Sequence, residues 1–150
     1  MDDLRELYQE VILDHGKHPR NFKAIEDATS TAHGSNPLCG DQLTIYIKLS
    51  DNGLLQDVAF TGRGCAISMA SASMLTELAI GKSELKMNEI FNAFHEMCIG
   101  SVEASELDEE LEKLQVLSGV KEFPTRVKCA TLSWHTLIAA LSGDIEVTTE

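Results

Sequence analysis

The sequence predicts an α+β fold in which a small antiparallel β-sheet of about three strands packs against about five helices. Two periodicities support this class. Over residues 42–49 apolar side chains alternate with polar ones, which is the pattern of a strand with one buried face. In five other segments apolar residues recur at intervals of three and four, which is typical of helices with one apolar face.

The strands are expected to begin with a hairpin. Leu43, Ile45 and Ile47 lie on the buried face of the first strand, and the triplet Asp-Asn-Gly that follows at residues 51–53 favours a tight turn. Residues 54–61 then return antiparallel to the first strand. We expect residues 28–33 to add a third strand.

The helices are marked by residues that start or stop them. Residues 3–15 have the spacing of an amphipathic helix. Residues 66–80 are rich in alanine, serine and methionine with almost no charge, which indicates a buried helix. Ser83 is positioned to cap a third helix, whereas Pro124 begins the last one and Gly143 closes it.

An acidic segment lies between the third and the last of these helices. Residues 103–112 contain six acidic side chains, yet Leu107, Leu111 and Leu114 keep a helical spacing. We therefore expect a solvated amphipathic α-helix that ends near Gly119. A second interpretation of the same pattern is that its acidic face docks a partner protein.

Length and composition indicate one ordinary globular domain. The chain has 150 residues, of which 43% are hydrophobic and 24% charged, with no internal repeat, linker or low-complexity tract. We expect a single domain over residues 1–150, with a frayed tail beyond about residue 143.

The charge balance excludes several partner classes. The formal net charge of −12 repels phosphate backbones and anionic lipid surfaces, so neither nucleic acid nor a membrane is an expected partner. The acidic start is unlike a secretory signal, and no apolar run approaches the roughly 18 residues that span a bilayer. These features predict a cytoplasmic protein with reduced cysteines.

Two of the four cysteines lie in turns that open onto regular elements. Cys39 stands in a Pro-Gly turn just before a strand, and Asp41, two residues on, shares its face of the chain. Cys65 follows Gly62 and Gly64 at the start of a predicted helix. A thiolate there lies near the positive end of the helix dipole.

The other two cysteines lie on helices. Cys98 belongs to the apolar stripe of the third helix, so we expect it to be structural. Cys129 lies in the first turns of the last helix, away from the predicted apolar stripe, so core packing explains it poorly. Arg126 and Lys128 beside it would favour its thiolate form.

Three thiolates and a carboxylate suit tetrahedral zinc, and thiolates also suit an iron-sulfur cluster. Spacing alone leaves alternatives open, because widely separated cytosolic cysteines are usually buried thiols. His95 and Cys98, at positions i and i+3, form a second candidate metal pair. A nucleophilic cysteine paired with histidine is a third reading, without a local signature.

Three motifs carry a family resemblance. They are NPLCGD at residues 36–41, GRGCAISMASASMLTE at 62–77 and RVKCATLSW at 126–134, each with one of the cysteines singled out above. Together they resemble the iron-sulfur cluster assembly scaffolds of the NifU/IscU type. The resemblance implies an α+β fold and a ligand site that gathers Cys39, Asp41, Cys65 and Cys129 at one exposed end. It also implies a pyridoxal-phosphate-dependent cysteine desulfurase as the sulfur donor.

Two departures point to the SufU-like branch of this family. The scaffold branch has a histidine before its third cysteine and a Leu-Pro-Pro-Val-Lys chaperone motif upstream. Here Lys128 precedes Cys129, and FPTRVK at residues 123–128 replaces the motif, so recognition by the dedicated chaperone is not expected. The acidic stretch at residues 103–120 resembles an insertion of SufU-type proteins.

The resemblance implies a zinc-bound sulfur acceptor in iron-sulfur cluster assembly, sulfurtransferase-like rather than an independent turnover enzyme. We expect Cys39 to accept the persulfide sulfur, because its loop is the most mobile ligand position. Arg126 and Lys128 are the expected contacts to the desulfurase, and downstream assembly or acceptor proteins are further partners. The main alternative is a scaffold on which a transient [2Fe-2S] cluster is built, with Asp41 as its labile ligand. A third possibility is a structural zinc module without sulfur chemistry.

Overall fold

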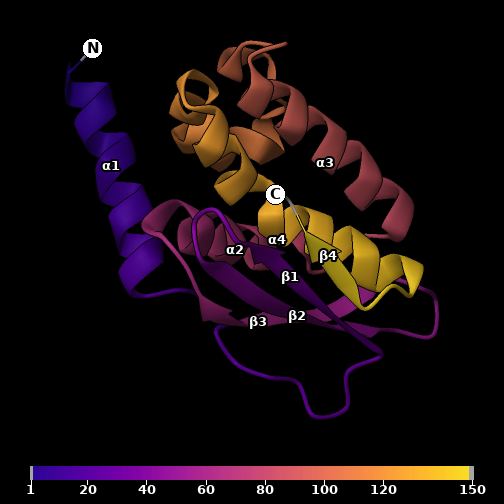
Figure 1. Cartoon of the computed structure of the whole chain (residues 1–150). Coiled ribbons are helices and arrows are strands. Elements are labelled where there is room, and N and C mark those ends of the chain that lie inside the picture. Colours follow the sequence, from indigo (N-terminus) through magenta and orange to yellow (C-terminus); the bar gives the residue numbers. More distant parts are fainter. Residues whose placement is uncertain (1, 149–150) are drawn as a thin grey trace.

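The computed structural model describes residues 2–148, and side chains from residue 8 onward. Its helices lie on one side of a four-stranded sheet (Figure 1), which confirms the predicted α+β class. The strands are β1 (Ser30–Asn36), β2 (Asp41–Leu49), β3 (Leu55–Arg63) and β4 (Glu146–Thr148). The helices are α1 (Asp2–Lys17), α2 (Ala66–Ala79), α3 (Glu84–Ile99) and α4 (Pro124–Ser142), with the 3₁₀ segments η1 (Ala104–Glu106) and η2 (Glu109–Glu122).

The sheet has the strand order β3-β2-β1-β4. The first three strands are antiparallel neighbours, as the alternating pattern predicted, and β1 extends the expected third strand to Asn36. The tail beyond residue 143 was expected to fray, and over residues 146–148 this is wrong. β4 pairs parallel with β1, and the His33 N–H donates to the carbonyl oxygen of Ile145 at 2.8 Å. An edge strand that offers free backbone groups can order a short tail in this way.

The helices α2 and α4 cover the inner face of the sheet. The buried side chains of β2 alternate with exposed or half-buried ones, as expected for a strand with one face in the core. Gly34 of β1 lets α4 approach closely, because a Cβ atom there would lie 2.0 Å from the Thr136 hydroxyl oxygen. Between the helices, the indole N–H of Trp134 donates to the Ser71 hydroxyl at 3.0 Å.

The helix α4 is buried more completely than its sequence predicts. Cys129 was placed away from the core stripe, but it is only 2% exposed, and Ser133 and Thr136 on the same side of α4 are fully buried. The prediction was wrong because α4 packs against the sheet on one side and against α2 and α3 on others. The side of α4 that stays half-exposed includes the apolar residues Val127 and Ile138, so the pattern of apolar residues does not reveal which side faces the core.

The acidic segment also differs from its prediction. It forms the 3₁₀ segments η1 and η2 instead of an α-helix. The 3₁₀ form has three residues per turn, so side chains three apart share one face. The buried residues follow this interval: Leu111, Leu114, Leu117 and Val120.

The helix α1 approaches the core near its end. His15 is only 7% exposed, and its Nδ1 lies 2.7 Å from the Ser73 hydroxyl of α2. Burial lowers the pKa of His15. Within residues 2–148 no helix has both the length and the apolar character that a membrane span requires.

The helix α3 begins at the predicted cap. The Ser83 hydroxyl accepts the Lys86 N–H at 3.1 Å, and Gly100 closes the helix at a φ of 85°. Cys98 lies fully buried on its apolar side, where burial raises the pKa of its thiol to about 12. A thiol in this environment is inert.

We expect Cys98→Ser to lower the free energy of unfolding by about 1–3 kcal/mol, because a hydroxyl would be buried among apolar groups without a partner. Urea denaturation followed by circular dichroism measures this loss. The metal content of the folded variant should equal that of the unmodified chain. A variant that is stable but poor in metal would contradict the structural role.

Candidate metal centre

Three elements converge at one end of the sheet. The turn of residues 37–40 joins β1 to β2 and pairs Asn36 with Asp41. Because Gln42 pairs with Arg63 at the end of β3, the chain enters α2 directly beside Asp41. The second turn of α4 brings Cys129 to the same place.

A sulfur pair and a carboxylate form the centre of this cluster. The Sγ atoms of Cys39 and Cys129 lie 3.0 Å apart. A carboxylate oxygen of Asp41 and these two sulfurs all lie within 4.8 Å of one another. Cys39 is half-buried, whereas Asp41 is fully buried and Cys129 is 2% exposed. The cluster thus opens to solvent on the side of Cys39.

Cys65 borders this triad as the N-cap of α2. Its backbone N–H donates to Asp41 Oδ1 at 2.9 Å, and its Sγ lies 4.0 Å from Asp41 Oδ2. The same sulfur accepts the Ser68 N–H at 3.5 Å, in the manner of a capping side chain. The exposed thiol of Cys65 is therefore held near the positive end of the helix dipole, as the sequence predicted.

The pKa of the Cys129 thiol is raised, although we expected Arg126 and Lys128 to favour its thiolate form. Burial is the main cause that raises the pKa of its thiol, and the hydrogen bond with Cys39 and the nearby Cys65 and Asp41 act in the same direction. The positive charges of Lys128 and Arg126 do not offset this rise in the pKa of Cys129. Acidic groups crowded together in this way are stabilised in their ionised forms by a bound cation.

Two residues of the site were missed as positioning groups. Asn36 is fully buried; its Oδ1 accepts the Leu38 N–H at 3.2 Å, and its Nδ2 lies 4.0 Å from the Cys129 sulfur. Gly64 was interpreted only as a turn residue. A Cβ atom at Gly64 would lie 2.6 Å from Asp41 Oδ1, so the glycine leaves room for the carboxylate.

We expect Gly64→Ala to weaken metal binding by about 10- to 100-fold, because the new methyl group displaces a carboxylate of the cluster. Competition with a chromophoric chelator measures the affinity. Gly119→Ala is the matched control, since a Cβ atom there meets nothing within 4 Å. Equal affinities of the two variants would contradict the proposed importance of the Asp41 position.

The two predicted partner contacts lie on different surfaces. Arg126 is exposed, and its guanidinium carbon lies 4.7 Å from the centre of the Phe123 ring. Both residues border a groove of about 560 Å³ between α1 and η2, which Ile67 of α2 also lines. Lys128 is half-buried and lines another hollow, of about 540 Å³, together with His95.

The alternative pair of His95 and Cys98 is not assembled into a cluster of donors. Cys98 faces the core, whereas the His95 ring packs near those of Phe91 and His135, with centroids 5.9 and 6.3 Å away. Among the described residues, one group of at least three histidine, cysteine or acidic donors has ligand atoms within 4.8 Å: Cys39, Asp41 and Cys129.

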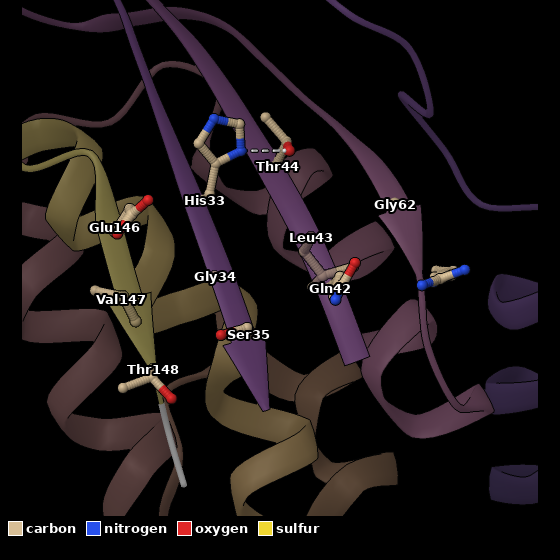
Figure 2. A pocket seen from close by; sticks show the side chains of 11 residues that line it. His33, Gly34, Ser35, Gln42, Leu43, Thr44, Gly62, Glu146, Val147 and Thr148 are labelled. Carbon is tan, nitrogen blue, oxygen red and sulfur yellow. Dashed lines mark hydrogen bonds between the residues drawn. The ribbon is translucent and has the colours of Figure 1, made fainter. Parts of the chain in front are cut away.

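A hollow of about 810 Å³ lies elsewhere, over β4, β1, β2 and the end of β3 (Figure 2). Within it, His33 Nδ1 lies 2.9 Å from the Thr44 hydroxyl. The residues that line the hollow include no cysteine. The chemistry of the thiols therefore belongs to the cluster at the end of the sheet.

Comparison with known proteins shows which family the sequence resembles. Residues 7–130 match the model of the NifU-like N terminal domain. The chain is 40% identical over 140 residues to the zinc-dependent sulfurtransferase SufU of Bacillus subtilis, covering 90% of this chain and 89% of that protein. It is 37% identical over 141 residues to the iron-sulfur cluster assembly scaffold protein IscU of Streptococcus pyogenes, covering 94% of this chain and 86% of that protein.

Solved structures show the same fold. The crystal structure of FiSufU from Fervidobacterium islandicum superposes with a TM-score of 0.80 at 37% identity, covering 91% of this chain and 98% of that one. A NifU-like protein from Brucella abortus has a TM-score of 0.83 at 18% identity, covering 93% and 95%, which is a likeness of fold alone. The chain therefore belongs to the family of proteins with a NifU-like N-terminal domain.

Proposed function

We propose that this chain is an iron-sulfur cluster assembly protein that binds zinc and accepts persulfide sulfur from a pyridoxal-phosphate-dependent cysteine desulfurase. The cluster of Cys39, Asp41 and Cys129, with Cys65 at its border, is the observation that supports this role. The similarity to a protein named as a zinc-dependent sulfurtransferase favours the same chemistry. We assign the role to a single domain of residues 1–150 in the cytoplasm.

The chemistry of the four donors suits a zinc ion, and three of them already lie close together. Tetrahedral zinc with sulfur and oxygen ligands requires donor atoms about 3.3–3.9 Å apart. The Cys39 and Cys129 sulfurs are 3.0 Å apart and would move slightly apart around an ion. Cys65 Sγ lies 4.0 Å from the Asp41 carboxylate but outside the group of donors within 4.8 Å of one another, so its side chain would turn inward to complete the shell. Cys39, Asp41, Cys65 and Cys129 would hold the ion, which supplies charge that keeps thiolates ionised near neutral pH.

Cys39 is the thiol best placed to receive sulfur. It lies in a loop, whereas Cys65 caps α2 and Cys129 is enclosed in the second turn of α4. Cys39 is half-buried, and the neighbouring Leu38 side chain is 68% exposed. A partner that covers Leu38 can therefore reach the Cys39 sulfur directly.

The transfer step is a thiol exchange. The Cys39 thiolate attacks the outer sulfur of the desulfurase persulfide, so that a new sulfur-sulfur bond forms as the old one breaks. The desulfurase cysteine leaves as a thiolate, and the outer sulfur remains on Cys39 as a persulfide. No electrons are gained or lost by the pair as a whole.

Exposed side chains near the cluster are suited to contact the desulfurase. Arg126 and Phe123 border the groove that Ile67, two residues after Cys65, also lines, and Phe123 is 48% exposed. Apolar groups rimmed by a cation are typical of interaction surfaces. We propose Arg126 as the primary charged contact and Lys128, on the adjoining surface, as a secondary one.

A scaffold role is the second candidate, favoured by the 37% identity to a protein named as an IscU scaffold. Thiolates can equally hold a [2Fe-2S] cluster, with Asp41 as its oxygen ligand. The two candidates differ in colour. Anaerobically purified protein with visible thiolate-to-iron absorption supports the scaffold, whereas colourless protein with about one zinc per chain supports the sulfur acceptor.

We expect Cys39→Ser to abolish persulfide acceptance, because a hydroxyl is too weak a nucleophile for this exchange. The protein is incubated with desulfurase and cysteine, and the sulfur is located by peptide mass spectrometry. Cys98→Ser is the matched control, since Cys98 is buried away from the cluster, and it should accept sulfur normally. Sulfur that still accumulates on the Cys39→Ser variant would refute the assignment. If the parent chain carries no added sulfur on any cysteine after the incubation, the acceptor role is refuted and a structural zinc module is favoured.

A further inference from the structure

The short distance between two sulfurs has a chemical consequence beyond metal binding. Cys39 Sγ and Cys129 Sγ are 3.0 Å apart, although 90 residues separate them along the chain. A disulfide bond is about 2.05 Å long, so an approach of about 1 Å would join them. Cys65 Sγ is not part of the group whose donor atoms all lie within 4.8 Å. Cys129 is therefore the thiol positioned to react at Cys39.

We propose that Cys129 is a resolving thiol, which releases the sulfur carried by Cys39 as sulfide. This proposal rests on the proposed function, since it requires a persulfide on Cys39. The Cys129 sulfur attacks the inner sulfur of that persulfide, and a Cys39–Cys129 disulfide forms as the bond to the outer sulfur breaks. The outer sulfur takes up the electron pair and leaves, with the proton of the Cys129 thiol, as hydrogen sulfide.

The electrons and atoms of this step balance within the chain. The outer sulfur is reduced by two electrons, and the two cysteine sulfurs are oxidised to a disulfide. The Asp41 carboxylate lies within 4.8 Å of both cysteine sulfurs and can accept the proton of the Cys129 thiol and pass it to the departing sulfur. A dithiol reductant, as a separate co-reactant, must then reduce the disulfide before the next sulfur is accepted.

The burial of the two thiols favours attack on the inner sulfur. Cys129 is 2% exposed, whereas Cys39 is half-buried and opens to the side from which a partner arrives. Sulfur delivered from the open side places the outer persulfide sulfur away from Cys129. Displacement at a sulfur atom requires the leaving group to lie opposite the nucleophile, so Cys129 can attack the inner sulfur while the outer sulfur leaves. The side-chain amide nitrogen of Asn36 lies 4.0 Å from the Cys129 sulfur and helps to hold that sulfur in place.

Zinc bound to Cys129 would occupy the sulfur that this step uses. The proposal therefore predicts that the metal-loaded protein keeps its persulfide and that removal of the metal triggers release. In a cell the same step would supply sulfide to whichever reaction combines sulfide with iron. The sulfane sulfur would thus be reduced on this chain instead of by an external reductant acting on the persulfide itself.

The experiment has two stages. In the first stage, the zinc-loaded full chain is incubated with desulfurase and cysteine and then separated from both. Mass spectrometry locates the persulfide, and a chain without a persulfide on Cys39 refutes the proposed function. A chelator is then added without air or reductant. We expect about one sulfide per persulfide, measured colorimetrically, together with a peptide linked through Cys39 and Cys129.

Variants separate this step from general loss of the site. Cys129→Ser should keep its Cys39 persulfide after chelation and release at least about tenfold less sulfide per persulfide loaded. Cys98→Ser is the control: it retains the sulfur pair and all four proposed ligands, so it should load and release sulfide like the unmodified chain. The proposal is overturned if the Cys39 persulfide survives chelation in the unmodified chain. It is equally overturned if the sulfur moves intact to Cys129 or if both variants behave alike.

Discussion

Replacing Asp41 with alanine should lower the zinc affinity of this protein by about 100-fold or more, because the change removes the only oxygen donor proposed for the ion. Asp41 is fully buried, and its carboxylate accepts the Cys65 N–H at 2.9 Å. The substitution therefore also loosens the start of α2.

Asp41→Asn is the matched control for this effect. The amide keeps the volume of the side chain and an oxygen that can accept the Cys65 N–H, but it lacks the negative charge. We expect an affinity between those of the parent and Asp41→Ala, measured by chelator competition at equal protein concentration. If Asp41→Ala binds zinc as tightly as the parent, Asp41 is not a ligand and the proposed donor set is wrong.

The largest effect on folding is expected for Trp134→Ala. Trp134 is 1% exposed on α4, stacks on the Phe94 ring at a centroid distance of 4.3 Å and donates to the Ser71 hydroxyl. Truncation should cost about 3–5 kcal/mol through lost packing and the cavity left behind. Because domains of this kind have a total stability of only about 5–15 kcal/mol, the variant should be near its unfolding threshold.

Trp134→Phe distinguishes packing from hydrogen bonding at this position. It keeps an aromatic ring against Phe94 and removes the bond to Ser71, so we expect a loss of about 1–2 kcal/mol. Thermal unfolding followed by circular dichroism compares the variants. The Ser71 hydroxyl still donates to the Ala130 carbonyl, beside Cys129, so the folded fraction should bind zinc normally. Equal losses in both variants would contradict a dominant role of packing.

Local sequence was sufficient for the parts of the site that lie close together along the chain. Cys39 and Asp41 share a face because they are two residues apart at the start of a strand, and the structure places them in one cluster. Cys65 follows a two-glycine turn, and the structure makes it the N-cap of α2. Likewise the alternating pattern of β2 and the small residues of α2 determined which faces are buried.

Long-range packing decided the rest. Cys129 reaches Cys39 only because α4 lies across the sheet, and the periodicity of α4 does not show this when most of the helix surface is covered. The 3₁₀ form of η2 and the pairing of β4 likewise depend on the surfaces that receive them. The sequence by itself determined which residues could bind a metal and the strands and turns that present them. The tertiary structure decided that two sulfurs far apart in the chain lie 3.0 Å from each other, because side-chain distances between elements are set by packing and not by spacing along the chain.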